Sequence, residues 1–394
     1  MHPIRKKMLG ELTERHQTGA MLFWRPDELV MLLGYMPLWG LSFLLYTPDD
    51  RMVLYVPELE PEDILPAGPD IVKYPWGLLN GGDPWEDLFE KMRRHVAVSG
   101  LSGRPLAFIR SVGGTAPCRM TAEQPPLPAD LVSRLENLVP AGFKDIAADL
   151  LCLYQYKTEQ DISAIKLAHR VTAEAVKTFY ASVREGVAET EVAAAIEATV
   201  QNMTGINGIG FARAWPMVQS GKNACFGGRY NRSSSKKLMT GELVMVELGV
   251  CVNGYWADIT RTASVGRVSD QQEKIFYTVR EAQRAALSLM RPGAAMSAVD
   301  DAARKHISVA GWGHLFNHAL GHQTGFRYHD PGPVLSPGSA GILKEGMLLT
   351  VEPGIYGPEV GAGVRIEDNV LITKNGYELL SDYPAGGLTG NDNK

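Results

Sequence analysis

Two stretches near the C-terminal end, K-E-G-M-L-L-T-V-E-P-G-I-Y (344–356) and G-V-R-I-E-D-N-V-L-I-T (363–373), combine strand-like apolar runs with acidic residues. Glu352 directly precedes a Pro-Gly turn signal, so its side chain is expected at a strand end, where sites are commonly built. Arg365 and Glu367 are two residues apart and therefore share one face of a predicted strand over 363–373. Both carboxylates are candidate metal ligands.

A second acidic pair lies upstream, in V-E-L-G-V-C-V-N-G-Y-W-A-D-I-T-R-T (246–262), where an Asn-Gly dipeptide between apolar runs predicts a hairpin. If this dipeptide forms the turn, Gly249 pairs with Asp258, and Glu247 lies diagonally from Asp258 on the same face. Diagonal neighbours are about 7–8 Å apart at Cα, close enough for two long carboxylates to share one ion. The alternative is a solvent-exposed sheet face. Two facing acids would resist burial unless a cation joined them.

The segment H-A-L-G-H-Q-T-G-F-R-Y-H-D (318–330) holds three of the nine histidines of the chain. His318 and His322 are four residues apart and share one face in a helix or a strand; the glycines between and after them favour an extended segment with close backbone approach. The spacing leaves the facing of His329 open. Four carboxylates and one imidazole suit two hard or borderline divalent ions and predict metal-assisted hydrolysis. The predicted metal ligands are Glu247, Asp258, His322, Glu352 and Glu367.

Length and composition exclude several other classes of protein. A chain of 394 residues is long for one core, so two domains are expected. The net charge of -5 argues against a nucleic-acid surface, and the longest apolar runs fall short of the roughly 18 residues of a membrane span. The charged start does not resemble a signal peptide. The four cysteines show no CxxC spacing and suit a reducing compartment, so a cytoplasmic protein is predicted.

Helix and strand patterns predict two domains of different construction. Residues 1–153 read as an α/β N-terminal domain, and residues 157–394 mix helices and strands without regular βαβ alternation, which indicates an α+β fold. Capping-box patterns predict helix starts in this second domain. They are Thr158-x-x-Asp161, Ser269-x-x-Gln272 and Ser297-x-x-Asp300.

These segments resemble the creatinase, aminopeptidase P and prolidase family of pita-bread metallopeptidases. The resemblance runs from K-T-E-Q-D-I-S-A-I-K-L-A (157–168), which is similar to the linker helix of that family, through S-G-K-N-A (220–224) to the end, and more weakly over the N-terminal half. It implies a C-terminal pita-bread domain, a smaller creatinase-like N-terminal domain and a homodimer. In such a dimer the N-terminal domain would help to close the neighbouring site, with Trp39, Trp76 and Trp85 as candidates.

The resemblance also implies roles for individual residues. Glu247 and Asp258 would bind one ion, His322 and Glu352 would hold the second, and Asp258 and Glu367 would bridge. Glu352 would also serve as a catalytic proton donor, and His318 and His329 as catalytic and substrate-contacting groups. Arg365, two residues from Glu367, is a candidate substrate-binding residue or only an ion-pair partner. The ions would be Mn²⁺, Co²⁺ or Zn²⁺. The activity implied is that of an Xaa-Pro dipeptidase or Xaa-Pro aminopeptidase acting on a small peptide.

Two departures from the family pattern leave the substrate open. Glu247 stands where the family normally has Asp, and Gly228 stands where a substrate-side histidine is usual. Arg229, beside it, could hold a carboxylate or could be a surface residue. A small non-peptide amide or amidine, as in creatinase-like or ectoine-hydrolase-like members, is therefore the alternative substrate. A catalytically inactive peptide-binding protein is the third reading, which the retained ligands disfavour.

Overall fold

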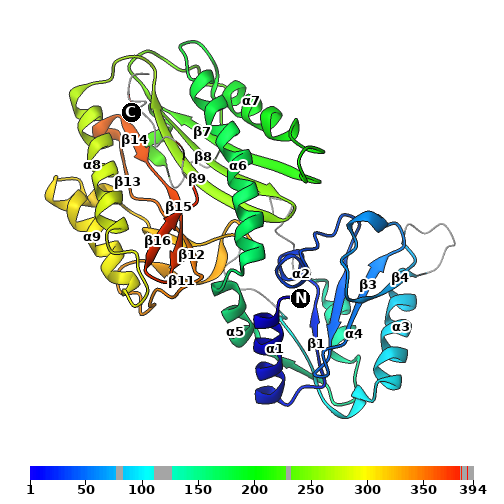
Figure 1. Ribbon diagram of the computed structural model, residues 1–394. Helices are drawn as coiled ribbons and strands as arrows, with labels where there is room; N and C mark the ends of the chain where they lie inside the picture. Colours follow the sequence, from blue (N-terminus) through cyan, green and yellow to red (C-terminus); the bar gives the residue numbers. More distant parts are fainter. Residues whose placement is uncertain (77–82, 111–126, 228–231, 382, 384–387, 389–394) are drawn as a thin grey trace. The chain divides into compact units, whose positions relative to one another are not determined.

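The computed structural model describes the chain except for residues 77–82, 111–126, 228–231, 382, 384–387 and 389–394 (Figure 1). The candidates Gly228 and Arg229 therefore lie outside the described residues. The chain divides into two compact units, Met1–Tyr154 and Gln155–Lys394. Among the described helices, none has the length and apolarity needed to span a bilayer.

The N-terminal unit is built on a six-stranded mixed sheet with the strand order β4-β3-β2-β1-β5-β6. Strands β1 to β3 pair antiparallel, whereas β4, β5 and β6 each join in parallel. Apolar side chains of α3 and α4 pack with the central strands in one core. The elements are α1 (Pro3–His16), β1 (Ala20–Phe23), α2 (Pro26–Leu33), β2 (Phe43–Tyr46), β3 (Met52–Pro57), β4 (Asp70–Tyr74), α3 (Pro84–Val98), β5 (Leu106–Phe108), α4 (Ala129–Glu136), β6 (Phe143–Asp145) and α5 (Ala147–Leu150).

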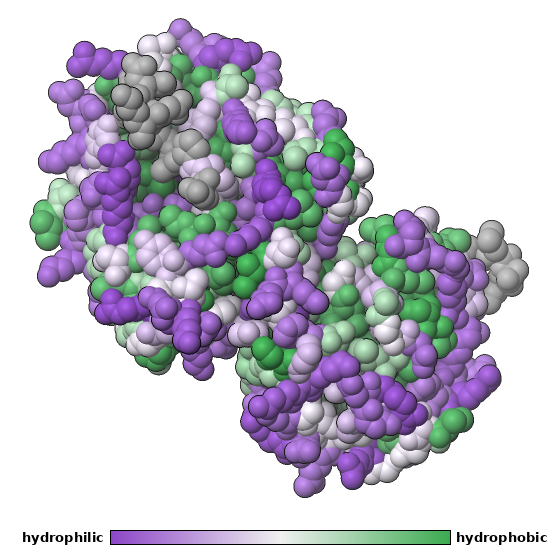
Figure 2. Space-filling view, in the orientation of Figure 1, coloured by the Kyte–Doolittle hydropathy of each residue, from purple (hydrophilic) through white to green (hydrophobic). Residues whose placement is uncertain are grey.

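Two of the three tryptophans suggested for closing a neighbouring site, Trp76 and Trp85, are partly buried and pack against this core, and their role in a dimer stays a prediction. Trp76 and Trp85 pack edge to face with ring centroids 6.0 Å apart, and both contact Tyr74. Trp39 is 47% exposed. Figure 2 shows hydrophilic and hydrophobic residues interspersed over the visible face of each unit.

The described residues of the C-terminal unit form three sheets and four long helices. The sheets have the orders β7-β8-β9, β11-β10-β12-β15-β16 and β13-β14. The elements are α6 (Glu159–Ser182), α7 (Glu189–Gln201), β7 (Ala212–Ser220), η4 (Ala224–Phe226), β8 (Leu243–Val252), β9 (Tyr255–Ser264), α8 (Asp270–Leu287), α9 (Met296–Val309), β10 (Gly321–Gln323), β11 (Asp330–Leu335), β12 (Leu348–Val351), β13 (Gly354–Gly357), β14 (Ala362–Arg365), β15 (Asp368–Thr373) and β16 (Gly376–Leu379).

Helices cover the sheets of this unit on two sides. Apolar side chains of α6 and α7 pack on β7 to β9, and those of α8 and α9 pack on the strands that follow them in sequence. Figure 1 shows the sheets between the helix pairs α6–α7 and α8–α9. The predicted α+β class is confirmed. The inner faces of the sheets are left to hold polar side chains.

Two of the three predicted capping boxes are present. Thr158 caps α6, where its hydroxyl accepts from the Asp161 N–H at 3.3 Å and Asp161 accepts from the Thr158 N–H at 2.7 Å. Ser269 and Gln272 form the same exchange at α8. The prediction for Ser297 is wrong, because α9 begins at Met296 with Ala295 as its N-cap. The acid of that pattern, Asp300, instead accepts two 2.8 Å hydrogen bonds from Arg304.

The last predicted strand is also interrupted. Residues 363–373 do not form one strand: β14 ends at Arg365 and β15 begins at Asp368, in a different sheet. The break arises because β14 pairs with β13 while β15 pairs with β12. Glu367 therefore lies on the connection between two sheets, where its side chain is free to turn inward.

Candidate metal centre

The hairpin β8–β9 places the first two acidic side chains. The register pairs Val252 with Tyr255 and Gly249 with Asp258, as predicted from the Asn-Gly turn. Asn253 and Gly254 both have positive φ, at 50° and 87°, which suits a two-residue hairpin turn. Asp258 is fully buried, and Glu247 is half-buried on the same face.

The imidazole of His322 is held on β10 by the backbone around it. Its Nδ1–H donates to the carbonyl oxygen of Gln323 at 3.0 Å, because a carbonyl can only accept. This leaves the Nε2 lone pair facing the acids, 3.5 Å from Asp258 Oδ2 and 3.4 Å from Glu352 Oε1. Gly321 permits the close approach predicted for this segment, since a Cβ there would lie 2.0 Å from the Thr350 carbonyl oxygen. A neutral imidazole with a fixed tautomer is the form that binds metals.

The five predicted ligands converge on one region of the C-terminal unit. Three overlapping groups of residues each offer ligand atoms that all lie within 4.8 Å of one another. The groups are Glu247 with Asp258 and Glu367, His322 with Glu352 and Glu367, and Asp258 with His322 and His329.

Buried carboxylate oxygens that lack hydrogen-bond partners indicate that these residues could hold a metal ion. Both carboxylate oxygens of Asp258 and Oε1 of Glu367 are buried and have no hydrogen-bond partner within the described part of the chain. Burial and the neighbouring carboxylates raise the pKa of Asp258 and of Glu367 well above their usual values, and burial raises the pKa of Glu352 to about 8. Burial lowers the pKa of His322 to about 4. Clustered acids beside a neutral imidazole form a donor set that divalent cations would stabilise.

Glu247 differs from the other acids because protein groups already bind both its oxygens. Oε1 accepts from the Tyr328 hydroxyl, and Oε2 accepts from the Thr260 hydroxyl and from Arg365. Burial alone would raise the pKa of Glu247, but Arg365, Thr260 and Tyr328 outweigh it and lower the pKa to about 2. The longer side chain thus places its charge against a guanidinium.

The predicted substrate-side residues border the acids. His318 Nε2 lies 3.0 Å from the Tyr356 hydroxyl, and Arg365 Nη1 donates to the same hydroxyl at 3.1 Å. His329 is exposed as a residue, but burial of its ring lowers its pKa to about 3, and the ring centroid lies 4.0 Å from that of His322. The structure therefore brings His318, His329 and Arg365 to the same site as the ligands.

A family model for metallopeptidase family M24 matches residues 163–374, which include every predicted ligand. The chain belongs to metallopeptidase family M24. This confirms the resemblance to creatinase, aminopeptidase P and prolidase, and identifies the chain as an Xaa-Pro peptidase-like enzyme.

Relatives of this M24 protein match over different lengths. A Xaa-Pro dipeptidase of Pyrococcus horikoshii is 31% identical over 376 residues, which are 95% of this chain and 96% of that protein. YkvY of Bacillus subtilis is 39% identical over 228 residues, which are 58% of this chain and 61% of that protein. The crystal structure of the prolidase from Pyrococcus horikoshii OT3 superposes with a TM-score of 0.78 at 28% identity, covering 97% of this chain and 99% of that one. The predicted pita-bread fold is confirmed.

Sequence reasoning missed three polar residues of the M24 site. The hairpin register could have identified Thr260, because it pairs directly with Glu247. Tyr356 follows the quoted E-P-G motif but carried no pattern of its own. Tyr328 lies next to His329, and only the fold brings its hydroxyl to Glu247.

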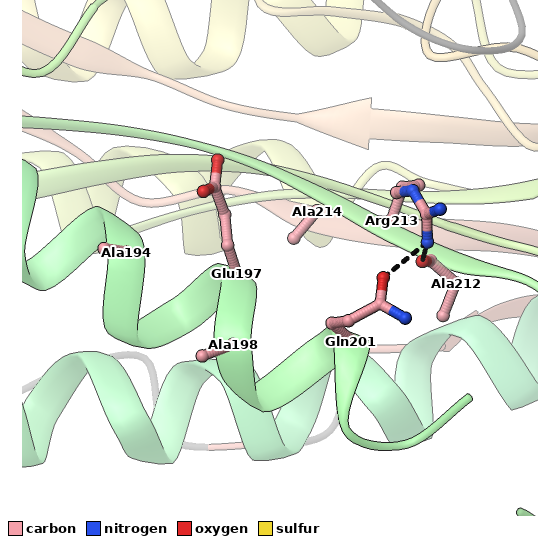
Figure 3. A pocket seen from close by; sticks show the side chains of 7 residues that line it. All are labelled: Ala194, Glu197, Ala198, Gln201, Ala212, Arg213 and Ala214. Carbon is pink, nitrogen blue, oxygen red and sulfur yellow. Dashed lines mark hydrogen bonds between the residues drawn. The ribbon is translucent and has the colours of Figure 1, made fainter. Parts of the chain in front are cut away.

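A separate hollow of about 460 Å³ lies between α7 and β7 and holds none of the predicted ligands (Figure 3). Its floor is formed largely by small side chains, and the Arg213 guanidinium donates to Gln201 within it. The lining residues are Ala194, Glu197, Ala198, Gln201, Ala212, Arg213 and Ala214. This hollow is not part of the candidate metal centre.

Proposed function

We propose that this M24 enzyme is a dinuclear metal-dependent hydrolase that cleaves an amide bond next to proline, as an Xaa-Pro dipeptidase or Xaa-Pro aminopeptidase. The observation that carries the proposal is the convergence of five ligands around the unsatisfied oxygens of Asp258 and Glu367. Glu247, Asp258, His322, Glu352 and Glu367 would hold the ions, Glu247 through the lone pairs that its protein donors leave over. Two such ions supply a hydroxide nucleophile at neutral pH and polarise the scissile carbonyl.

Residues of the chain supply the remaining steps. Glu352, at the end of β12 and 3.4 Å from His322, is placed to carry a proton to the leaving amine. His329, exposed beside His322, would donate to the oxyanion of the tetrahedral intermediate. His318 and Arg365, joined through the Tyr356 hydroxyl, form the polar edge that would orient the peptide.

Reconstitution with metals tests this proposal. Protein stripped with EDTA would be reloaded with Mn²⁺, Co²⁺ or Zn²⁺ and assayed on Xaa-Pro dipeptides and Xaa-Pro-Yaa tripeptides. We expect metal-restored cleavage, with the preferred length separating a dipeptidase from an aminopeptidase. Bound metal without peptide cleavage would refute the peptidase proposal and favour the small-amide alternative suggested by Gly228 and Arg229. Absence of bound metal would favour an inactive peptide-binding protein. The homodimer and the cytoplasmic location remain predictions.

A further inference from the structure

A buried carboxylate outside the candidate metal centre accepts hydrogen bonds on both of its oxygens. Glu189 is the first residue of α7 and is fully buried. It accepts hydrogen bonds from three side chains and two backbone amides, at distances of 2.6 to 3.0 Å. The donors are Ser220 N and Oγ, Asn223 Nδ2, and Ser234 N and Oγ. The helix N-terminus adds a favourable field for the negative charge.

These donors come from two places in the chain that Glu189 holds together. Ser220 ends β7 and Asn223 precedes η4, whereas Ser234 lies eleven residues beyond Asn223. The turn after β7 is continued by backbone hydrogen bonds from Asn223 N to Ser220 O at 3.0 Å and from Gly227 N to Ala224 O at 3.1 Å. Fixing Ser220 and Asn223 therefore fixes the position of η4.

The turn from η4 to Gly227 presses directly on the strands that carry the substrate-side residues. A Cβ on Gly363 of β14 would lie 1.9 Å from the Ala224 carbonyl oxygen, and a Cβ on Gly227 would lie 2.2 Å from the Tyr356 ring. At the other end of that ring, a Cβ on Gly354 would lie 2.1 Å from the Tyr356 hydroxyl. The ring of Tyr356 is thus held between two glycine backbones and has no room to shift independently of η4.

We infer that Glu189 is a positioning residue for the substrate side of the proposed peptidase site. It acts through η4 on Tyr356, whose hydroxyl lies 3.0 Å from His318 and 3.1 Å from Arg365. The inference rests on the proposed function, since His318 and Arg365 orient the peptide there. Among the described contacts, none of the five ligands touches Glu189 or its donors, and the route meets a ligand only at its far end, where Arg365 binds Glu247. The first effect of a change at Glu189 is therefore expected on binding of substrate.

The substitution Glu189→Gln separates this role from simple space filling. The amide keeps the shape but presents N–H groups where one oxygen stood, opposite the backbone N–H of Ser220 or of Ser234. Neither backbone donor can reverse its role, so one contact becomes repulsive whichever way the amide turns. Glu191→Gln is the matched control. Glu191 lies in the same helical turn but is exposed, where it binds Lys237 and the Ala188 N–H.

Steady-state kinetics on a cleaved Xaa-Pro peptide give the main test. We expect Glu189→Gln to raise KM by about tenfold or more, with kcat within about twofold and with unchanged metal content. The reason is that displaced His318 and Arg365 would bind the substrate and the transition state less tightly to the same extent. Glu191→Gln should behave as wild type. An unchanged KM together with a lowered Tm would show a purely structural role and overturn the inference.

A double-mutant cycle with Tyr356→Phe tests the route. If Glu189 acts through the tyrosine hydroxyl, Glu189→Gln should change KM by less than about threefold in the Tyr356→Phe background. An equal change in both backgrounds would overturn the inference. If Glu189→Gln does not fold, Asn223→Ala removes one half-buried donor and should raise KM in the same direction. No rise in that variant would count against the role of Glu189.

Hydrogen exchange provides a readout that does not need turnover. Glu189→Gln should accelerate amide exchange at residues 224–227 and at Tyr356 while leaving β8 and β9 unchanged. Unchanged exchange at Tyr356 would overturn the inference even in an active enzyme. A wild-type protein that binds metal but cleaves no peptide would refute the proposed function, and the exchange result would still test the positioning of Tyr356.

Discussion

Replacing Lys157 by methionine should leave a charge stranded in the C-terminal unit. Lys157 Nζ binds Asp330 Oδ2 at 2.8 Å, and both side chains are 0% exposed. Removing one partner of a buried ion pair costs about 3–5 kcal/mol. Asp330 keeps the backbone N–H of Arg327 at 2.8 Å and that of Phe326 at 3.4 Å, so we expect the lower end of this range. For a unit of this size, about 3 kcal/mol corresponds to a fall in Tm of about 6–12 °C.

Thermal unfolding of the metal-free protein, followed by calorimetry, measures this change. Lys157→Met combined with Asp330→Asn should recover part of the lost Tm, because no charge remains and the amide oxygen can still accept from the Arg327 N–H, which binds Oδ1, while the longer contact from the Phe326 N–H to Oδ2 is given up. The matched control is Lys166→Met, which breaks the exposed Lys166–Glu378 pair of 2.6 Å and should cost at most about 1 kcal/mol. Equal Tm values for the single and the double variant would refute the reasoning from buried charge.

Three further predictions concern other buried acids. Burial raises the pKa of Glu28 from 4.5 to about 7. As the pH rises from 4.5 to 7, the free energy of unfolding should therefore fall by up to about 3 kcal/mol relative to that of Glu28→Gln. A difference in unfolding free energy that does not change with pH would contradict this. Asp258→Ala and Glu352→Gln should each abolish turnover while the far-UV circular dichroism stays native, and substantial remaining activity in either would contradict the dinuclear assignment. Glu247→Asp should give an active protein with a changed metal preference, measured by metal titration; complete inactivity would mean that the site depends on the longer side chain.

Local sequence signals predicted the parts of this site that depend on neighbours in the chain. The Asn-Gly turn was enough to place Glu247 and Asp258 on one face, because hairpin register follows from turn length. The same local reasoning failed at 363–373, where the choice between two partner strands interrupts the strand. Ser297 failed as a cap because Asp300 makes a bidentate pair with Arg304 instead.

Contacts between distant segments could not be predicted in this way. Tyr328 reaches Glu247 across the fold, and Glu189 reaches Ser220 and Ser234 without any periodic pattern that links them. In the sequence alone, Tyr328 and Glu189 look the same as any surface tyrosine or glutamate. The contact of Tyr328 with Glu247 and the packing of β13 and β14 against η4, on which the inference about Glu189 rests, are seen only in the folded chain.

The distribution of the metal ligands over separate sheets has a kinetic consequence. Ions held by β8–β9, by β10 and by the β14–β15 connection would cross-link segments that are far apart in sequence, as a disulfide does, and would close long loops in the native state. Partly folded forms in which any one of these segments is displaced would lose metal ligands and, with them, most of their affinity for the ions. Metal release and separation of the sheets are therefore expected to be one event, whose rate sets the lifetime of the active enzyme under proteolysis.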